Sequence, residues 1–81
     1  MATSEIRSPL PGVFYRSPSP EEPNYKEVGD AVKAGDVIGL VEVMKTYTEV
    51  KAETDGTIAS FAVENEDAIM PGQVVAEVEI L

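Results

Sequence analysis

The chain contains an internal repeat, and this repeat restricts the possible folds more than any other feature of the sequence. Residues 27–43 (EVGDAVKAGDVIGLVEV) align with residues 64–80 (ENEDAIMPGQVVAEVEI) at a constant offset of 37 positions. Seven of the seventeen aligned positions are identical, and most of the others keep their apolar character. Because each half has the same order of strand, glycine turn and strand, we expect two similar half-sheets that close on each other.

Alternating apolar and polar residues predict eight short strands and require no helix. The predicted strands are Glu5–Ser8, Gly12–Arg16, Asp30–Val32, Val37–Val43, Thr46–Ala52, Thr57–Val63, Asp67–Ile69 and Val74–Ile80. Their inward side is expected to include Val37, Val41, Val50, Ile58, Val74 and Val78. The predicted fold is all-β: a flattened barrel or sandwich with pseudo-two-fold symmetry, made of two four-stranded antiparallel sheets.

Composition limits how this fold can be stabilised and what chemistry it can perform. The sequence, residues 1–81, is expected to form one small domain. It has no cysteine for disulfides or thiolate metal sites, and no histidine for general-base catalysis or zinc binding. With 43% apolar residues, a hydrophobic core can hold the domain without covalent cross-links. An autonomous enzyme is not expected.

Charge and hydropathy restrict the partners and the location. Six basic and fifteen acidic residues give a formal net charge of −9, which repels nucleic-acid phosphates. No apolar stretch approaches the roughly 20 residues that span a bilayer. Residues 1–5 also lack the basic-then-apolar order of a secretory signal. We therefore expect no nucleic-acid or membrane partner, and a soluble, intracellular protein.

One lysine stands at the tip of a predicted hairpin. The strands Val37–Val43 and Thr46–Ala52 leave only Met44 and Lys45 between them, which is the shortest hairpin connection. Such turns favour Asn-Gly or Gly-Gly because both central residues need unusual backbone angles, and Met-Lys accepts a steric cost there. A cost of this kind indicates a function for the lysine.

The repeat also predicts where this hairpin lies. Position 45 maps to position 82, one place beyond the last residue, so the chain ends occupy the two-fold equivalent of the hairpin tip. Lys45 and the termini are therefore expected at opposite poles. Lys26, Lys33 and Lys51 are expected to be ordinary solvated charges.

The segment Val41–Lys45 (VEVMK) resembles the attachment sequence Glu-Ala-Met-Lys-Met of biotinyl carrier domains. The resemblance extends to residues 27–32 and 50–58 and covers most of the chain from about Pro11. It implies a hammerhead-like fold of the biotinyl/lipoyl type, with biotin attached covalently to Lys45. The remaining residues of the implied attachment motif are Glu42, Val43, Met44 and Thr46.

Two positions of this motif differ from the family pattern. Val43 replaces the usual alanine and Thr46 the usual methionine, while the Met44-Lys45 centre is intact. Slower modification, or modification by only one ligase, would follow from this difference. Glu42 recurs in the repeat as Glu79, so a solvated strand face explains Glu42 as well as recognition does.

A proline-rich insertion distinguishes the first half from the second. Gly12-Val13-Phe14 aligns with Gly56-Thr57-Ile58 at an offset of 44 instead of 37, so the first half has seven extra residues. These fall at about 17–24, where three prolines interrupt any sheet pairing. On the residues alone this is a stiff surface loop.

The sequence around that insertion, residues 14–20 (FYRSPSP), is similar to the "thumb" of carriers from acetyl-CoA carboxylases of the bacterial multisubunit type. In the family the thumb lies beside the biotin ring system. The resemblance therefore places four residues near the cofactor, namely Ser17, Pro18, Ser19 and Pro20.

The resemblance further implies a non-catalytic carrier that works between several partners. A biotin protein ligase would attach the cofactor. A biotin carboxylase subunit would then carboxylate it with ATP and bicarbonate, and a carboxyltransferase subunit would deliver the carboxyl group to an acyl-CoA, in this case acetyl-CoA for fatty acid biosynthesis. The isolated domain is expected to be monomeric. The expected location is the cytoplasm or, for a plant protein, the plastid stroma. Carriers of this type have an additional N-terminal segment and linker, so an excised domain or a short stand-alone carrier is expected.

Two alternative functions remain open from the sequence. A lipoyl carrier has a similar fold and a modified hairpin lysine, although its site usually reads Asp-Lys-Ala. An unmodified β-domain that serves as an adaptor would use the lysine only as a surface charge. The acidic residues Glu64, Glu66 and Asp67 lack the alternating ligands of a calcium loop and are interpreted as surface charge.

Overall fold

The computed structural model describes residues 2–80, and this part of the chain forms eight strands without a helix. The strands are β1 (Ala2–Arg7), β2 (Gly12–Tyr15), β3 (Ala31–Val32), β4 (Val37–Val43), β5 (Thr46–Lys51), β6 (Gly56–Phe61), β7 (Ala68–Ile69) and β8 (Val74–Ile80). They follow the predicted order, and the largest difference in a boundary is at β1, which begins three residues early because Ala2 to Ser4 pair with β8. The described residues contain no helix capable of spanning a membrane.

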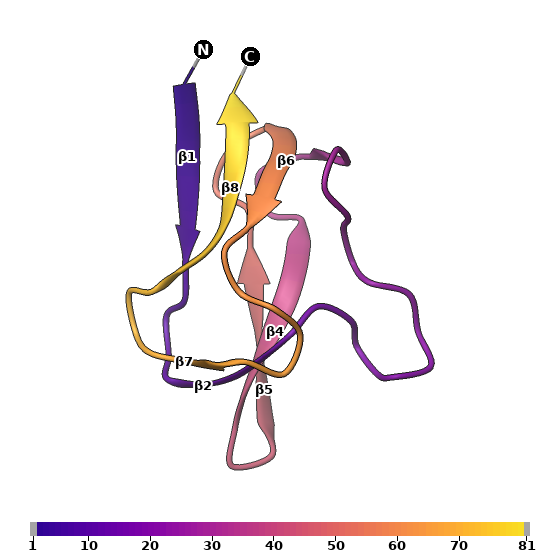
Figure 1. Ribbon diagram of the computed structural model, residues 1–81, viewed down its shortest axis with the longest axis vertical. Coiled ribbons are helices and arrows are strands. Elements are labelled where there is room, and N and C mark those ends of the chain that lie inside the picture. Colours follow the sequence, from indigo (N-terminus) through magenta and orange to yellow (C-terminus); the bar gives the residue numbers. More distant parts are fainter. Residues whose placement is uncertain (1, 81) are drawn as a thin grey trace.

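The strands form two antiparallel four-stranded sheets, which confirms the predicted all-β class (Figure 1). One sheet has the order β1-β8-β6-β3 and the other β5-β4-β2-β7. The repeat relates β8 to β4, β6 to β2 and β3 to β7, so equivalent strands occupy equivalent positions in the two sheets. Each sheet nevertheless contains strands from both halves, because the short strands β3 and β7 pair with the strands of the opposite half.

The hydrophobic core lies between the sheets. Its buried side chains are Ile6, Phe14, Val32, Ile38, Val41, Val50, Ala52, Ile58, Val63, Ile69, Val75, Ala76 and Val78. Four of the six residues predicted to face inward belong to this set. The other two, Val37 and Val74, are only partly buried, and here the prediction was wrong.

The reason is a β-bulge at the start of each long strand. Between β4 and β5 the pairing passes from Val37 to Gly39 and leaves Ile38 as an extra residue. Between β8 and β1 it passes from Val74 to Ala76 and leaves Val75 as the extra residue. A bulge shifts the alternation of inward and outward side chains by one position. Ile38 and Val75, which the repeat relates, therefore enter the core and are 0% exposed.

The β4–β5 hairpin projects from one end of the molecule, whereas β1 begins and β8 ends at the other end (Figure 1). The molecule measures 38 × 27 × 19 Å along its principal axes. The hairpin lies at one end of the longest axis, and the start of β1 and the end of β8 lie at the other. This arrangement agrees with the position that the repeat predicts for Lys45. The hairpin tip can thus meet a partner while the chain ends remain far from that contact.

Candidate functional site

Met44 and Lys45 form the two-residue turn at the tip of the β4–β5 hairpin. Val43 pairs with Thr46 across the turn, as predicted. The φ angles of Met44 and Lys45 are 49° and 67°, so both residues adopt the left-handed conformation that a type I′ turn requires. This conformation costs a non-glycine residue roughly 1–2 kcal/mol. The turn exposes the side chains of both residues to solvent, and Met44 is 93% exposed.

The other residues of the predicted attachment motif lie at the base of this turn. Thr46 is exposed, and Val43 is partly buried and packs against the core. Glu42 accepts a hydrogen bond from the Tyr15 hydroxyl at 3.1 Å. This bond raises the pKa of the Tyr15 phenol, because ionisation would leave two negative oxygens in contact. Glu42 therefore connects the hairpin to β2.

A groove of about 380 Å³ lies between the hairpin strands and the proline-rich insertion, residues 17–24, which we call the thumb loop. Its lining residues are Tyr15, Ser17, Pro18, Ser19, Pro20, Leu40, Tyr47, Asn65 and Glu66. The structure thus brings the four predicted thumb residues to one wall of a groove. Tyr47, which follows Lys45 by two positions and is 57% exposed, also lines the groove.

The thumb loop has a defined shape of its own. The Ser17 hydroxyl donates to the Ser19 carbonyl at 2.9 Å, and the Glu22 amide donates to the same carbonyl at 3.1 Å. The loop is closed at its base by the Tyr25 amide, which donates to the Arg16 carbonyl at 2.8 Å. These bonds and the three prolines restrict the backbone of the loop.

The sequence analysis did not select the groove residues Tyr15, Leu40, Tyr47, Asn65 and Glu66. For Glu66, the repeat contained a signal that this position is unusual: the alignment of the two halves places Glu66 opposite Gly29. Both residues adopt a left-handed backbone, with φ angles of 70° and 95°. Glutamate at a position where the other half has glycine accepts strain, and strain of this kind concentrates at functional sites.

The acidic residues interpreted as surface charge include one with a structural contact. The Asp67 carboxylate accepts a hydrogen bond from the Glu64 amide at 2.8 Å, and the equivalent Asp30 carboxylate accepts one from the Glu27 amide at 2.8 Å. Each aspartate thus stabilises the turn before β7 or β3. Across residues 2–80 no cluster of three or more potential metal ligands occurs.

The sequence matches the protein family described as "Biotin-requiring enzyme" over residues 4–78, which is most of the chain. The chain belongs to this family. Among its relatives, the biotin carboxyl carrier protein of acetyl-CoA carboxylase from Pseudomonas aeruginosa is 50% identical over 60 residues, covering 74% of this chain and 38% of the relative. The protein of the same name from Streptococcus pyogenes is 46% identical over 68 residues, covering 84% of this chain and 41% of the relative. The chain thus spans about two-fifths of the length of these relatives.

Two solved structures are similar to this chain in fold. The urea carboxylase of Kluyveromyces lactis superimposes with a TM-score of 0.79 at 28% identity, covering 98% of this chain and 6% of that one. An aspartoacylase family protein from Mesorhizobium loti superimposes with a TM-score of 0.71 at 20% identity, covering 95% of this chain and 25% of that one. The second likeness concerns the fold alone.

Proposed function

We propose that this chain is a biotin carboxyl carrier in which Lys45 holds biotin in an amide linkage. The observation that carries the proposal is the Met44-Lys45 turn, which exposes one lysine at the pole opposite the chain ends in a member of the biotin-requiring enzyme family. Acylation of the Lys45 amine removes its charge and extends its four-methylene side chain into a long arm. A carrier needs an arm of this kind to reach two partner sites.

The residues around the hairpin suit such a cofactor. Tyr15, Leu40 and Tyr47 offer apolar surface for a ring system, and the groove also contains hydroxyl and carboxylate groups that can accept hydrogen bonds. When bound, biotin supplies the ureido nitrogen that accepts and releases a carboxyl group, and the protein supplies position and effective concentration. The chain itself is proposed to have no catalytic residue.

The proposed partners are a biotin protein ligase, a biotin carboxylase and a carboxyltransferase that uses acetyl-CoA. The relatives named as carriers of acetyl-CoA carboxylase support this choice. Within residues 17–24, the four residues Ser17, Pro18, Ser19 and Pro20 are proposed to contact the cofactor, since they line the groove together with Tyr47. The motif residues Glu42, Val43, Met44 and Thr46 are proposed to be recognised by the ligase.

Reconstitution with purified partners tests the proposal. After incubation with biotin ligase, ATP and biotin, the intact mass is expected to increase by one biotinyl group. With a bacterial-type biotin carboxylase, ATP and labelled bicarbonate, followed by the matching carboxyltransferase, the label is expected to reach acetyl-CoA. A lipoyl increment or no increment would contradict biotinylation. Transfer to propionyl-CoA or pyruvate but not to acetyl-CoA would contradict only the pathway.

Shortening the thumb loop tests its proposed contact with the cofactor. Residues 17–24 would be replaced by Asn-Gly, which can join Arg16 to Tyr25 as a two-residue turn because their backbones are already hydrogen-bonded. The loop lies outside the paired strands, so the variant is expected to fold and to be biotinylated. Its carboxyl transfer at saturating partners is expected to fall about tenfold, the equivalent of one lost cofactor contact.

Circular dichroism and a labelling assay provide the controls for this variant. Unfolding would show that the loop is part of the structural framework. Carboxyl transfer equal to that of the unmodified carrier would show that the loop has no part in handling the cofactor. Either result would contradict the proposed role of the thumb loop.

A further inference from the structure

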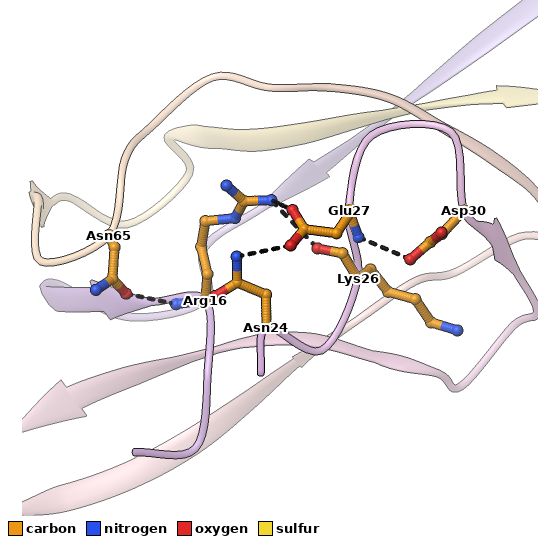
Figure 2. Close-up of polar contacts among 6 residues, drawn as sticks. All are labelled: Arg16, Asn24, Lys26, Glu27, Asp30 and Asn65. Carbon is orange, nitrogen blue, oxygen red and sulfur yellow. Dashed lines mark hydrogen bonds and ion pairs between the residues drawn. The ribbon is translucent and has the colours of Figure 1, made fainter. Parts of the chain in front are cut away.

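Arg16 lies between the last residue of β2, Tyr15, and the first residue of the thumb loop, Ser17. Its backbone forms two hydrogen bonds, of which Figure 2 shows the one to Asn65. Its amide donates to the Asn65 side-chain oxygen at 2.8 Å. Its carbonyl accepts from the Tyr25 amide, at the other end of the loop, at 2.8 Å. Arg16 therefore joins the start of the thumb loop both to its end and to the loop before β7.

The Arg16 side chain binds the segment by which the thumb loop returns, as Figure 2 shows. Its Nη2 donates to the Glu27 carboxylate at 2.9 Å and to the Lys26 carbonyl at 3.2 Å. The other oxygen of Glu27 accepts from the Asn24 side-chain amide at 3.2 Å. Asn24 is the last residue of the thumb loop, so Glu27 connects the loop to the guanidinium.

The same guanidinium also contacts the opposite sheet. Its central carbon lies 4.0 Å from the ring centroid of Phe61, which belongs to β6 and packs against the core. The Arg16 side chain is 21% exposed, whereas Glu27 is 63% exposed. Among residues 2–80, the buried Arg16 Nε has no hydrogen-bond partner. The cation–π contact and two charge-assisted bonds offset that cost.

These contacts are the main attachment of the thumb loop to the barrel. In the described chain, the hydrogen bonds of residues 17–24 either stay within the loop or end on Glu27, and Glu27 is held by Arg16. The loop has no strand pairing of its own to fix its angle. Loss of the guanidinium would therefore leave the loop shaped internally but free to swing at its base.

We propose that Arg16 is a positioning residue that fixes the thumb loop against the barrel and thereby sets the width of the groove. The inference rests on the proposed carrier function, since the groove matters only if the loop handles the cofactor. Arg16 acts through the loop and touches neither Lys45 nor its turn in any contact of the described residues. Its substitution should consequently alter carboxyl transfer without altering attachment of biotin.

Arg7 offers a matched control, because it is the other arginine of the sequence and also forms an ion pair. It lies on β1, where its Nη2 contacts Glu5 at 2.5 Å and its Nη1 donates to the Gly72 carbonyl at 2.7 Å. Arg7→Gln therefore removes a comparable set of contacts away from the thumb loop. A difference between Arg16→Gln and Arg7→Gln is therefore due to the place of Arg16 beside the thumb loop and not to the loss of an arginine in general.

The first measurement is hydrogen exchange of the Tyr25 amide, whose bond to Arg16 closes the loop. In Arg16→Gln its protection is expected to fall about tenfold, because charge-assisted bonds that hold the closed base are lost. Arg7→Gln should leave it unchanged, and Glu27→Gln, at an exposed position, should lower it to a smaller extent. Arg16→Lys, which keeps the charge but not the planar fork, should restore part of the protection.

The second measurement is carboxyl transfer by the biotinylated variants. Arg16→Gln is expected to lower it about threefold to tenfold while labelling by the ligase stays unchanged. When residues 17–24 are replaced by Asn-Gly, the same substitution should lower transfer by less than about 1.5-fold, because no loop remains to be positioned.

The inference would be overturned if Arg16→Gln lowered carboxyl transfer by the same factor with and without the thumb loop. It would also be overturned if Arg16→Gln left the hydrogen-exchange protection of the Tyr25 amide unchanged. If the wild-type chain is never biotinylated, the proposed function fails on its own. Tyr25 exchange still decides in that case whether Arg16 holds the loop. Should Arg16→Gln unfold, Glu27→Gln provides the same comparison from an exposed partner.

Discussion

Lys45→Arg is expected to abolish labelling by biotin ligase. Arginine keeps the positive charge and most of the length of lysine, but its guanidinium stays protonated and does not form the amide that attaches biotin. The turn should be unaffected, because Lys45 is exposed and arginine adopts the same backbone conformation at a similar cost. Streptavidin blotting and intact mass measure the loss, and thermal unfolding measures the stability, which should change by less than about 0.5 kcal/mol.

Lys51→Arg is the matched control for this variant. Lys51 lies in the neighbouring strand β5, is exposed, and has its ammonium 3.6 Å from the Glu49 carboxylate. The variant should be labelled as fast as the wild type. Undiminished labelling of Lys45→Arg would disprove the assignment of Lys45. Loss of stability in Lys45→Arg would instead show that this lysine contributes to the fold.

Much of the fold could be predicted because the repeat states the same local pattern twice. Strand order and hairpin length follow from short-range alternation, and Val43 pairs with Thr46 as the two-residue spacing requires. The bulges at Ile38 and Val75 could not be predicted from the sequence. Their positions depend on the pairing register with the neighbouring strand, which leaves one residue of each long strand without a partner. In an apolar run such as Val37-Ile38, the pattern is equally compatible with Val37 or with Ile38 as the residue that faces the core.

The part of the candidate site that is formed by neighbouring residues of the sequence could be predicted, whereas the part that joins distant segments could not. The position of Lys45 at a hairpin tip could be predicted because its turn and flanking strands are contiguous in the sequence. The groove could not, since it joins Tyr15, Tyr47 and Glu66 from segments far apart in the chain. The contact of Arg16 with Asn65 likewise spans 49 positions. The alternation of apolar and polar residues does not indicate contacts between such distant residues. Only the alignment of Glu66 with Gly29 in the repeat indicated that the loop between β6 and β7 is unusual.

Gly56→Ala is expected to destabilise the domain by about 3 kcal/mol through a steric clash. A Cβ at Gly56 would lie 2.3 Å from the Glu79 carbonyl oxygen and 2.6 Å from a Val78 methyl group, so the backbone of β8 would have to move. In a domain of this size, each kcal/mol lowers the melting temperature by about 4–8 °C. Gly35→Ala is the control, because its Cβ would meet no atom within 4 Å and only its φ of +95° opposes alanine. Its expected cost is about 1 kcal/mol, and equal costs for the two variants would contradict the clash.

Gly12→Ala extends this test from stability to function. Gly12 is equivalent to Gly56, and its Cβ would lie 2.3 Å from the Glu42 carbonyl oxygen, so a similar loss of stability is expected. The strand displaced by Gly12→Ala is β4, which leads into the Met44-Lys45 turn, whereas Gly56→Ala displaces β8 near the chain ends. Below the melting temperature of both variants, ligase labelling should therefore be slowed by Gly12→Ala and not by Gly56→Ala. Equal labelling rates would show that the ligase does not require the exact position of β4.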